Sequence, residues 1–145
     1  MKDKQLLTVS LISKEATIEK NKVSAVFLIG FFDEKIIVTR NERGWDIPGG
    51  YLKKKEELLE GLRRETEEEA GVFFTNAVPF AKLSASNKNK HMVFFASNSC
   101  TLSNFIKKSD VFERDLLSVK IFIKHYYGDK DLMFDLIQKA QESLK

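Results

Sequence analysis

Three glutamates between residues 65 and 69 have the spacing that would bring their carboxylates onto one face of a helix. Glu68 follows Glu65 by three residues and Glu69 follows it by four, so a wheel of 100° per residue places all three within one arc. Side chains at these spacings have Cβ atoms about 5–6 Å apart, and their like charges repel. A hard divalent cation such as Mg²⁺, which prefers oxygen ligands, would cancel that repulsion. The spacing therefore predicts a metal site made of these carboxylates.

The residues around the glutamates suit the same site. A Pro-Gly-Gly turn at 48–50 precedes the helix, and its backbone can approach closely because glycine has no Cβ, so we expect the carbonyl of Gly49 to join the metal ligands. Gly61, one turn before Glu65, is expected to leave the carboxylate patch open. The arc formed by Leu59, Leu62, Thr66 and Ala70 is expected to pack on a sheet.

The lysines at 53–55 stand at the helix entrance, from which they could reach phosphate groups. Mg²⁺ held by carboxylates commonly bridges phosphate oxygens and activates a water. Each feature also has a plainer interpretation, since acidic helical stretches are mostly solvated faces, Pro-Gly-Gly is usually only a turn, and consecutive lysines are usually exposed. The joint spacing favours the metal site over three separate explanations.

The composition is that of a globular protein. The chain has 145 residues, 43% hydrophobic and 31% charged, and its net charge of +3 is spread along its whole length. We therefore expect one domain over residues 1–145, a modest preference for anionic ligands and no nucleic-acid-binding face. Cys100 is the only cysteine, so no disulfide can form within the chain, and two His with one Cys exclude a zinc cluster of the usual kind.

Targeting and membrane signals are missing from the pattern. No stretch approaches the roughly eighteen apolar residues of a membrane span. The N-terminal apolar run alternates with polar residues and lacks a small-residue cleavage site, which indicates a strand rather than a signal peptide. We expect a cytoplasmic protein without a membrane partner.

The periodicity predicts an α/β chain with a hairpin-rich mixed sheet flanked by at least two helices. The run at 23–30 is continuously apolar and rich in β-branched residues, which is typical of a central strand. Gly71 stands where a helix C-cap belongs, and Asp129 where an N-cap belongs. The predicted strands are 5–12, 23–30, 35–40, one or two within 72–83, 91–102 and 119–123; the predicted helices are 56–70 and 129–144, and 103–115 is a loop.

A longer pattern contains the glutamates. Residues 50 to 72 read Gly50-x5-Glu56-x7-Arg64-Glu65-Thr66-x-Glu68-Glu69-x-Gly71-Val72. This pattern resembles the Nudix box, the signature of the Nudix hydrolase superfamily, with all seven fixed identities at the family's spacing. The preceding WDIPGG, residues 45–50, resembles the usual lead-in. Thr66 stands where an aliphatic residue is more common, but its methyl group can pack in the same way.

The resemblance implies a Nudix-type α/β/α sandwich with a central mixed sheet. It also implies hydrolysis of a nucleoside diphosphate linked to a group X, in which water attacks a pyrophosphate phosphorus with the help of Mg²⁺ or Mn²⁺. Position by position, it implies the following roles: Glu65, Glu68, Glu69 and the Gly49 carbonyl as metal ligands, Arg64 as the residue that orients the catalytic glutamates, and Glu56 as a support of the loop–helix geometry that Gly50 begins.

The general base stays open at this point. Glu65 or Glu69 is the candidate within the box. Outside it, Glu113 precedes the last predicted strand, where many family members place an acidic residue, and Asp110 and Asp115 compete with it.

The leading hypothesis is a pyrophosphohydrolase that converts a nucleoside triphosphate, oxidised ones included, to the monophosphate and pyrophosphate. The alternative is a non-catalytic Nudix domain that senses a nucleotide or binds a partner. We expect a small-molecule nucleotide as the ligand and no stable nucleic-acid partner, and a homodimer is compatible with the apolar N-terminal strand. The candidate substrate contacts are Trp45, Lys53 and Phe95, then Phe27, Phe94, Tyr126 and Tyr127 for base stacking and Lys82, Lys88 and Lys90 for phosphate; core packing is the commoner role of such aromatics.

Overall fold

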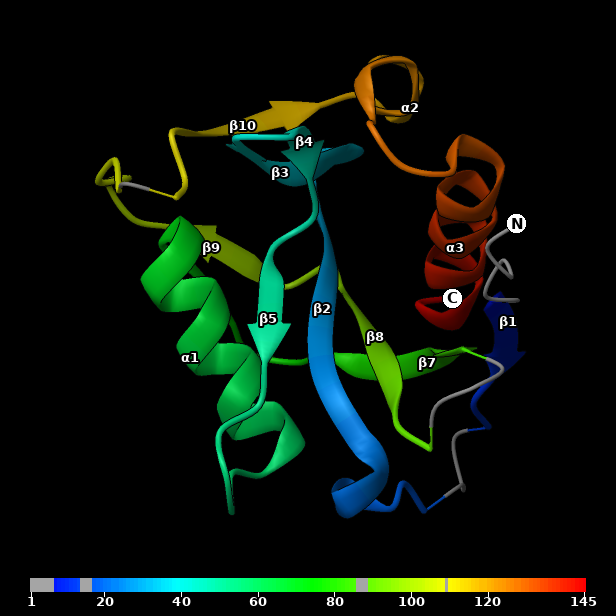
Figure 1. Cartoon of the computed structure of the whole chain (residues 1–145). Coiled ribbons are helices and arrows are strands. Elements are labelled where there is room, and N and C mark those ends of the chain that lie inside the picture. Colours follow the sequence, from blue (N-terminus) through cyan, green and yellow to red (C-terminus); the bar gives the residue numbers. More distant parts are fainter. Residues whose placement is uncertain (1–6, 14–16, 86–88, 109) are drawn as a thin grey trace, which may run out of the picture.

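The computed structural model describes residues 7–13, 17–85, 89–108 and 110–145 (Figure 1). Of the residues named above, Lys88 lies outside these ranges, as does the start of the predicted strand 5–12. The strands are β1 (Leu7–Leu11), β2 (Val23–Phe32), β3 (Lys35–Asn41), β4 (Gly44–Asp46), β5 (Gly49–Tyr51), β6 (Val72–Phe74), β7 (Val78–Ala85), β8 (His91–Ser97), β9 (Cys100–Leu102) and β10 (Glu113–Leu117). The helices are η1 (Lys20–Lys22), α1 (Leu58–Ala70), α2 (Val119–His125) and α3 (Lys130–Ser143).

The main sheet is mixed and has the strand order β1-β7-β8-β2-β3-β10. The pairing of β2 with β8 is parallel, and the other described pairings in the sheet are antiparallel. Two short strands lie off this path, since β5 pairs with β2 and β4 pairs with β3. Strand β5 carries the Gly49-Gly50 turn, so the middle of the sheet holds that turn in place.

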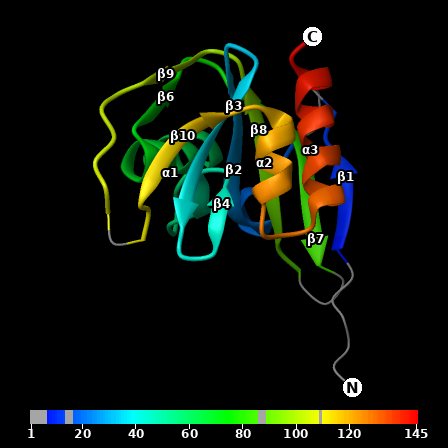
Figure 2. The same cartoon turned by 90° about the horizontal axis from the view of Figure 1, so that it is seen from above.

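Helices cover both faces of the sheet (Figures 1 and 2). Helix α1 contacts β2, β5 and β6, whereas α3 contacts β7 and β8, and α2 contacts β3 and β4. The predicted α/β/α sandwich is therefore confirmed. Each face has its own hydrophobic core, and the central strand serves both, because successive side chains of a strand point to opposite faces. Leu28 of β2 is buried in the core beside α1, and Ile29 in the core beside α3.

The ends of the two long helices follow the predicted capping residues. Helix α3 begins after Asp129, whose Oδ1 accepts a hydrogen bond from the backbone of Leu132 at 3.1 Å. Helix α1 ends at Gly71, which has the left-handed backbone (φ 62°) that glycine adopts most easily. The predicted start of α1 at 56 is two residues early, because Glu56 bends back toward the helix instead of joining it.

The prediction of a last strand at 119–123 is wrong, because these residues form helix α2. Ser118 is its N-cap, and the Ser118 hydroxyl accepts a hydrogen bond from the backbone of Ile121 at 3.2 Å. Strand β10 instead takes the edge position next to β3, and its first three residues, 113–115, lie in the stretch 103–115 that was predicted to be a loop. The predicted strand 91–102 is likewise two strands, β8 and β9, separated at residues 98–99.

None of the helices within the described ranges is both long and apolar enough to cross a bilayer.

The helical form of 119–125 can be tested by two truncations. In a strand, Ile121 would share a face with its neighbours at 119 and 123, opposite to Phe122; in the helix, Phe122 is fully buried and Ile121 is 49% exposed. We expect Phe122→Ala to lower the free energy of unfolding by about 3–5 kcal/mol and Ile121→Ala by less than about 1 kcal/mol, as measured by urea denaturation. The reverse order would contradict the helix.

Candidate functional site

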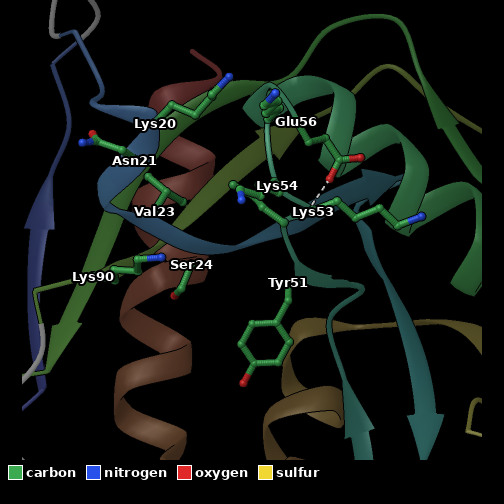
Figure 3. Close-up of a pocket in the computed structure, with 11 residues that line it drawn as sticks. Lys20, Asn21, Val23, Ser24, Tyr51, Lys53, Lys54, Glu56 and Lys90 are labelled. Carbon is green, nitrogen blue, oxygen red and sulfur yellow. Dashed lines mark hydrogen bonds between the residues drawn. The ribbon is translucent and has the colours of Figure 1, made fainter.

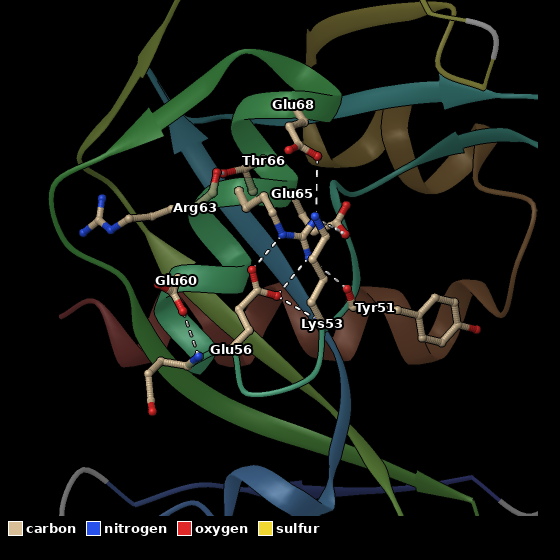
Figure 4. A network of polar contacts seen from close by, with 10 residues as sticks. Tyr51, Lys53, Glu56, Glu60, Arg63, Glu65, Thr66 and Glu68 are labelled. Atoms are coloured by element: carbon tan, nitrogen blue, oxygen red, sulfur yellow. Dashed lines mark hydrogen bonds and ion pairs between the residues drawn. The ribbon is translucent and has the colours of Figure 1, made fainter.

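Arg64 on α1 forms hydrogen bonds with Glu56, Glu65 and Tyr51, which are labelled in the polar network of Figure 4. Its Nε donates to Oε2 of Glu56 at 2.7 Å and its Nη2 to Oε1 of the same carboxylate at 3.0 Å. Its Nη1 donates to Oε1 of Glu65 at 2.9 Å, with Oε2 of Glu68 3.6 Å away. The backbone carbonyl of Tyr51 accepts a further bond at 3.2 Å. One guanidinium therefore joins β5, the loop after it and the acidic face of α1.

Glu56 is the better buried partner of this ion pair. Its side chain is 8% exposed, and its carboxylate also accepts the backbone N–H of Lys53 at 2.9 Å. The Arg64 hydrogen bonds hold the pKa of Glu56 down at about 2, and Glu56 in turn raises the pKa of Arg64. Both groups are thus charged at neutral pH, and together they fix the loop before α1 to the helix.

Two glycines allow the backbone of β5 to approach these groups. A Cβ on Gly50 would lie 2.7 Å from the carboxylate of Glu65, and a Cβ on Gly49 would lie 2.3 Å from the carbonyl oxygen of Val26 on β2. Any side chain at either position would push β5 away from Glu65 or from β2. The geometry explains why the turn needs glycine twice.

Glu69 lies in a region crowded with negative charge. Burial first, and then the charges of Glu65, Asp46 and Asp110, raise its pKa to about 8, and the nearby backbone N–H of Gly49 opposes that rise. Two of these four acids, Glu65 and Glu69, were expected from the helix spacing. The charges of Glu65, Asp46 and Asp110 thus act on Glu69. Among the described residues, Arg64 is the one cation that forms a hydrogen bond with any of these four carboxylates.

Asp46 is the acid that the sequence reasoning did not single out. It ends β4, and its Oδ2 accepts the hydroxyl of Tyr127 at 2.7 Å while its Oδ1 accepts the N–H of Ile47 at 2.8 Å. Burial raises its pKa. The available signal was its place in WDIPGG, where a charged residue directly precedes the buried run Ile47-Pro48-Gly49.

The donor set fits a hard divalent cation, because all its members are carboxylate or backbone oxygens. The arrangement is not yet that of a filled metal site. Within the part of the chain that the structure describes, no three acidic, His or Cys side chains gather closely enough to hold a metal ion. Instead, Nη1 of Arg64 lies near the carboxylates of both Glu65 and Glu68. Glu68 is 60% exposed, so its side chain has room to turn toward Glu69.

Two expectations about the helix faces are wrong. Gly61 does not open the carboxylate patch, because a Cβ there would lie 2.3 Å from Leu52 and 2.9 Å from Glu56. Gly61 makes room for the loop before the helix. Leu59 is 42% exposed and does not pack on the sheet, whereas Leu62, Thr66 and Ala70 are buried there as expected.

The acids proposed outside the box are not equivalent. Glu113 lies on β10 opposite Arg40 of β3, and Nε of Arg40 donates to Glu113 Oε1 at 2.8 Å. Asp115, on the same strand, accepts the backbone N–H of Leu116 at 2.8 Å. Asp110 is the member of the group whose charge acts on Glu69.

The candidate substrate contacts are also separated by the fold. Phe95 is 2% exposed in the core beside α1, which leaves no ring face for a ligand. Trp45 is half-buried against the core on the other face, and Lys53 lines a cavity that does not include the box glutamates at 65, 68 and 69.

A small cavity of about 130 Å³ lies between the sheet and α3 and opens beside Asp46. The rings of Phe27 and Phe94 are stacked in its lining with centroids 5.4 Å apart. The other lining residues are Ile47, Leu83, Met92, Tyr126, Leu132, Met133 and Leu136. The cavity is thus apolar, with a carboxylate and a phenol at its edge.

A family model for the NUDIX domain matches residues 21–119, which is more than half of the chain. Among solved structures, a pyrophosphohydrolase of Bacillus subtilis is similar over 97% of this chain and 97% of its own, with a TM-score of 0.69 and 18% identity. The MutT protein of Methanosarcina mazei Go1 is similar over 89% of this chain and 99% of its own (TM-score 0.62, 19% identity). A MutT protein of Bacillus halodurans covers 78% and 80% (TM-score 0.62, 17% identity).

No curated protein sequence matches the chain significantly. Because the identities are below 20%, the similar structures show the fold only. The family is shown by the domain match. Together with the intact box around Arg64, these findings show that the chain belongs to the Nudix family, as a hydrolase that acts on phosphoric anhydride bonds.

Proposed function

We propose that the protein is a metal-dependent pyrophosphohydrolase that cleaves a nucleoside triphosphate, oxidised ones included, to the monophosphate and pyrophosphate. The observation that carries the proposal is the carboxylate of Glu65, which Arg64 holds against Gly50. Glu69 lies within electrostatic reach of Glu65, Asp46 and Asp110. The pyrophosphohydrolase class is supported by the family match and by a similar structure that is named a pyrophosphohydrolase.

Glu65, Glu68, Glu69 and the carbonyl of Gly49 would hold the metal ion. Bound there, Mg²⁺ or Mn²⁺ would neutralise phosphate charge and acidify the attacking water. The protein's own contribution is positional. Arg64 binds the carboxylate of Glu65, which lies against Gly50, and Glu56 holds Arg64 through two further hydrogen bonds.

The attacking water must give its proton to a base near the reacting phosphorus. Within the box, Glu65 and Glu69 remain the candidates. Outside it, we propose Asp110 in preference to Glu113, because the charge of Asp110 acts on Glu69 while Arg40 binds the carboxylate of Glu113.

The cavity beside Asp46 supports a substrate with a flat apolar group. Its stacked rings, Phe27 and Phe94, offer dispersion and stacking contacts to a nucleobase. Asp46 lies within electrostatic reach of Glu69, so a ligand that fills this cavity would have its phosphates beside the carboxylates. This placement is our reason for preferring a nucleotide to another pyrophosphate ester.

The decisive experiment is a substrate panel with Mg²⁺ or Mn²⁺. Nucleoside triphosphates, oxidised nucleotides, nucleotide sugars, dinucleoside polyphosphates and capped RNA are incubated with the full chain, and the products are identified. We expect monophosphate and pyrophosphate from a triphosphate. Tight nucleotide binding with no turnover of any compound would favour the non-catalytic alternative.

The box glutamates can be tested one at a time. Glu68→Gln and Glu69→Gln each remove a charged metal ligand, so we expect kcat to fall at least about 10²-fold. We also expect the rise in Tm that Mg²⁺ gives the wild type to shrink in both variants, because the carboxylate repulsion that the ion relieves is smaller. Glu67→Gln, an exposed change on another face of α1, is the control and should leave both quantities unchanged. A near-normal kcat in either variant would remove that residue from the metal site.

The ion pair of Glu56 and Arg64 predicts a pH-dependent stability. The folded pKa of Glu56 is about 2 against an ordinary value of 4.5, so its charge stabilises the fold above pH 4.5 and this contribution is lost as the pH falls toward 2. We expect Glu56→Gln to lower the free energy of unfolding by about 1.5–3 kcal/mol at pH 7. The gap to the wild type should close between pH 4.5 and 2, as followed by urea denaturation at each pH. A gap that is constant over this range would mean that the pair contributes through packing, not charge.

A further inference from the structure

A second cavity, of about 700 Å³, is lined by five lysines from three separate segments (Figure 3). Lys20 belongs to η1, Lys53, Lys54 and Lys55 to the loop between β5 and α1, and Lys90 immediately precedes β8. These segments are far apart in the sequence, and the pairing of β2 with both β5 and β8 brings them together. We call this space the lysine cavity.

The charge of the lysine cavity is poorly compensated. Its one acidic lining residue, Glu56, already has its carboxylate bound by Arg64. Lys20 forms an exposed ion pair with Glu57 at 2.9 Å. Over the described ranges, no ion pair forms between an acid and any of the lysines at 53, 54, 55 and 90. Like charges around one cavity repel, so an anion in the cavity would stabilise it.

The backbone of Lys55 gives an independent reason to suspect a ligand. The loop turns sharply, with the N–H of Glu56 donating to the carbonyl of Lys53 at 3.1 Å, and Lys55 has φ +66°. A side chain other than glycine is strained in this left-handed conformation. Strained backbone of this kind occurs at ordinary turns, as at Asp33 and Glu34, and is also concentrated at functional sites, so at Lys55 it adds to the charge of the cavity.

The lysine cavity is distinct from the carboxylate site. Its lining includes none of Glu65, Glu68 and Glu69. Glu56 lines the cavity, and Arg64, which binds Glu56, also binds Glu65 of the carboxylate site. The lysines at 53–55 were expected to reach phosphates beside the metal. In the structure they line a cavity that does not include Glu65, Glu68 and Glu69.

We propose that the lysine cavity binds a small anion with a chain of two or more phosphate groups. Four of the five lysines form no ion pair with a described acid, and their combined charge exceeds that of one phosphate ion. A short phosphate chain carries a comparable charge and fits within about 700 Å³. Ammonium groups on flexible stems suit such a chain, because each acts as a point charge that can follow a phosphate oxygen. The site requires neither hydrolysis nor a divalent metal.

The test is calorimetric titration of the full chain with inorganic tripolyphosphate in the presence of EDTA. Lys54→Ala combined with Lys90→Ala removes cations from two sides of the cavity, and we expect at least about tenfold weaker binding from the loss of two charge contacts. The matched control combines Lys120→Ala with Lys124→Ala, which removes the same charge from exposed positions of α2, outside the cavity lining. The control should bind as the wild type does.

One substitution, Lys55→Gly, distinguishes a loss of ligand binding from a loss of stability. Lys55→Gly relieves the left-handed strain, so its Tm should equal or exceed that of the wild type while the affinity for tripolyphosphate falls several-fold. An unchanged affinity in this variant would overturn the role of Lys55 and with it the interpretation of the strain.

Four other outcomes would overturn the proposal: no binding of tripolyphosphate, equal loss in the α2 control, orthophosphate binding as tight as tripolyphosphate, or binding of a single-stranded oligonucleotide alone. The last would indicate a nucleic-acid surface instead. Because the titration contains no divalent metal and no turnover is measured, failure of the hydrolase proposal would leave this result interpretable.

Discussion

The contact on which the site depends is the salt bridge between Arg64 and Glu56. Arg64 has a rigid, planar set of donors, and the structure uses them in three directions at once: toward the loop before α1, toward the carbonyl of Tyr51 and toward Glu65. A flexible ammonium group could not hold these three partners in a fixed mutual geometry. The guanidinium thereby converts a surface helix and a short strand into one unit, and Glu65 has its position because that unit is rigid.

The same salt bridge contacts two regions of opposite charge. Arg64 binds Glu65, one of the acids whose charges act on Glu69, and Glu56 lines the lysine cavity. Without the salt bridge, flexible lysines next to acidic side chains would neutralise them and occupy the space of a metal ion. Glu56 and Arg64 neutralise each other instead, so that both neighbouring regions keep their charge for ligands.

Local spacing was sufficient to predict what the box and the capping residues determine. The acidic face of α1, the cap at Gly71, the central strand β2 and the start of α3 at Asp129 each depend on residues within a few positions of one another. The prediction failed where distant residues decide. The apolar run at 119–123 has the composition of a strand, but β10 occupies the sheet edge, and the cap at Ser118 and the burial of Phe122 favour a helix.

The site residues that local sequence could not identify are those whose neighbours are distant in the chain. Phe95 could not be assigned from sequence, because both faces of β8 are buried and the alternation does not tell which face meets a ligand. Asp46 acts on Glu69 across the fold, and Lys20 and Lys90 meet the loop at 53–55 only after the sheet has formed. No local pattern contains these long-range relations.

The parallel pairing of β2 with β8 has a consequence for how the molecule folds. It joins strands from the two halves of the chain, with Val26 opposite Val93, and β5 reaches its place on the other edge of β2. Such a topology has a high contact order, so loop closure must precede much of the stabilising burial and folding is expected to be slow. On a ribosome the segment up to α1 would emerge complete but without β8 beside it. We therefore expect the Gly49-Gly50 turn and helix α1 to reach their final positions only after β8 has been synthesised and has paired with β2.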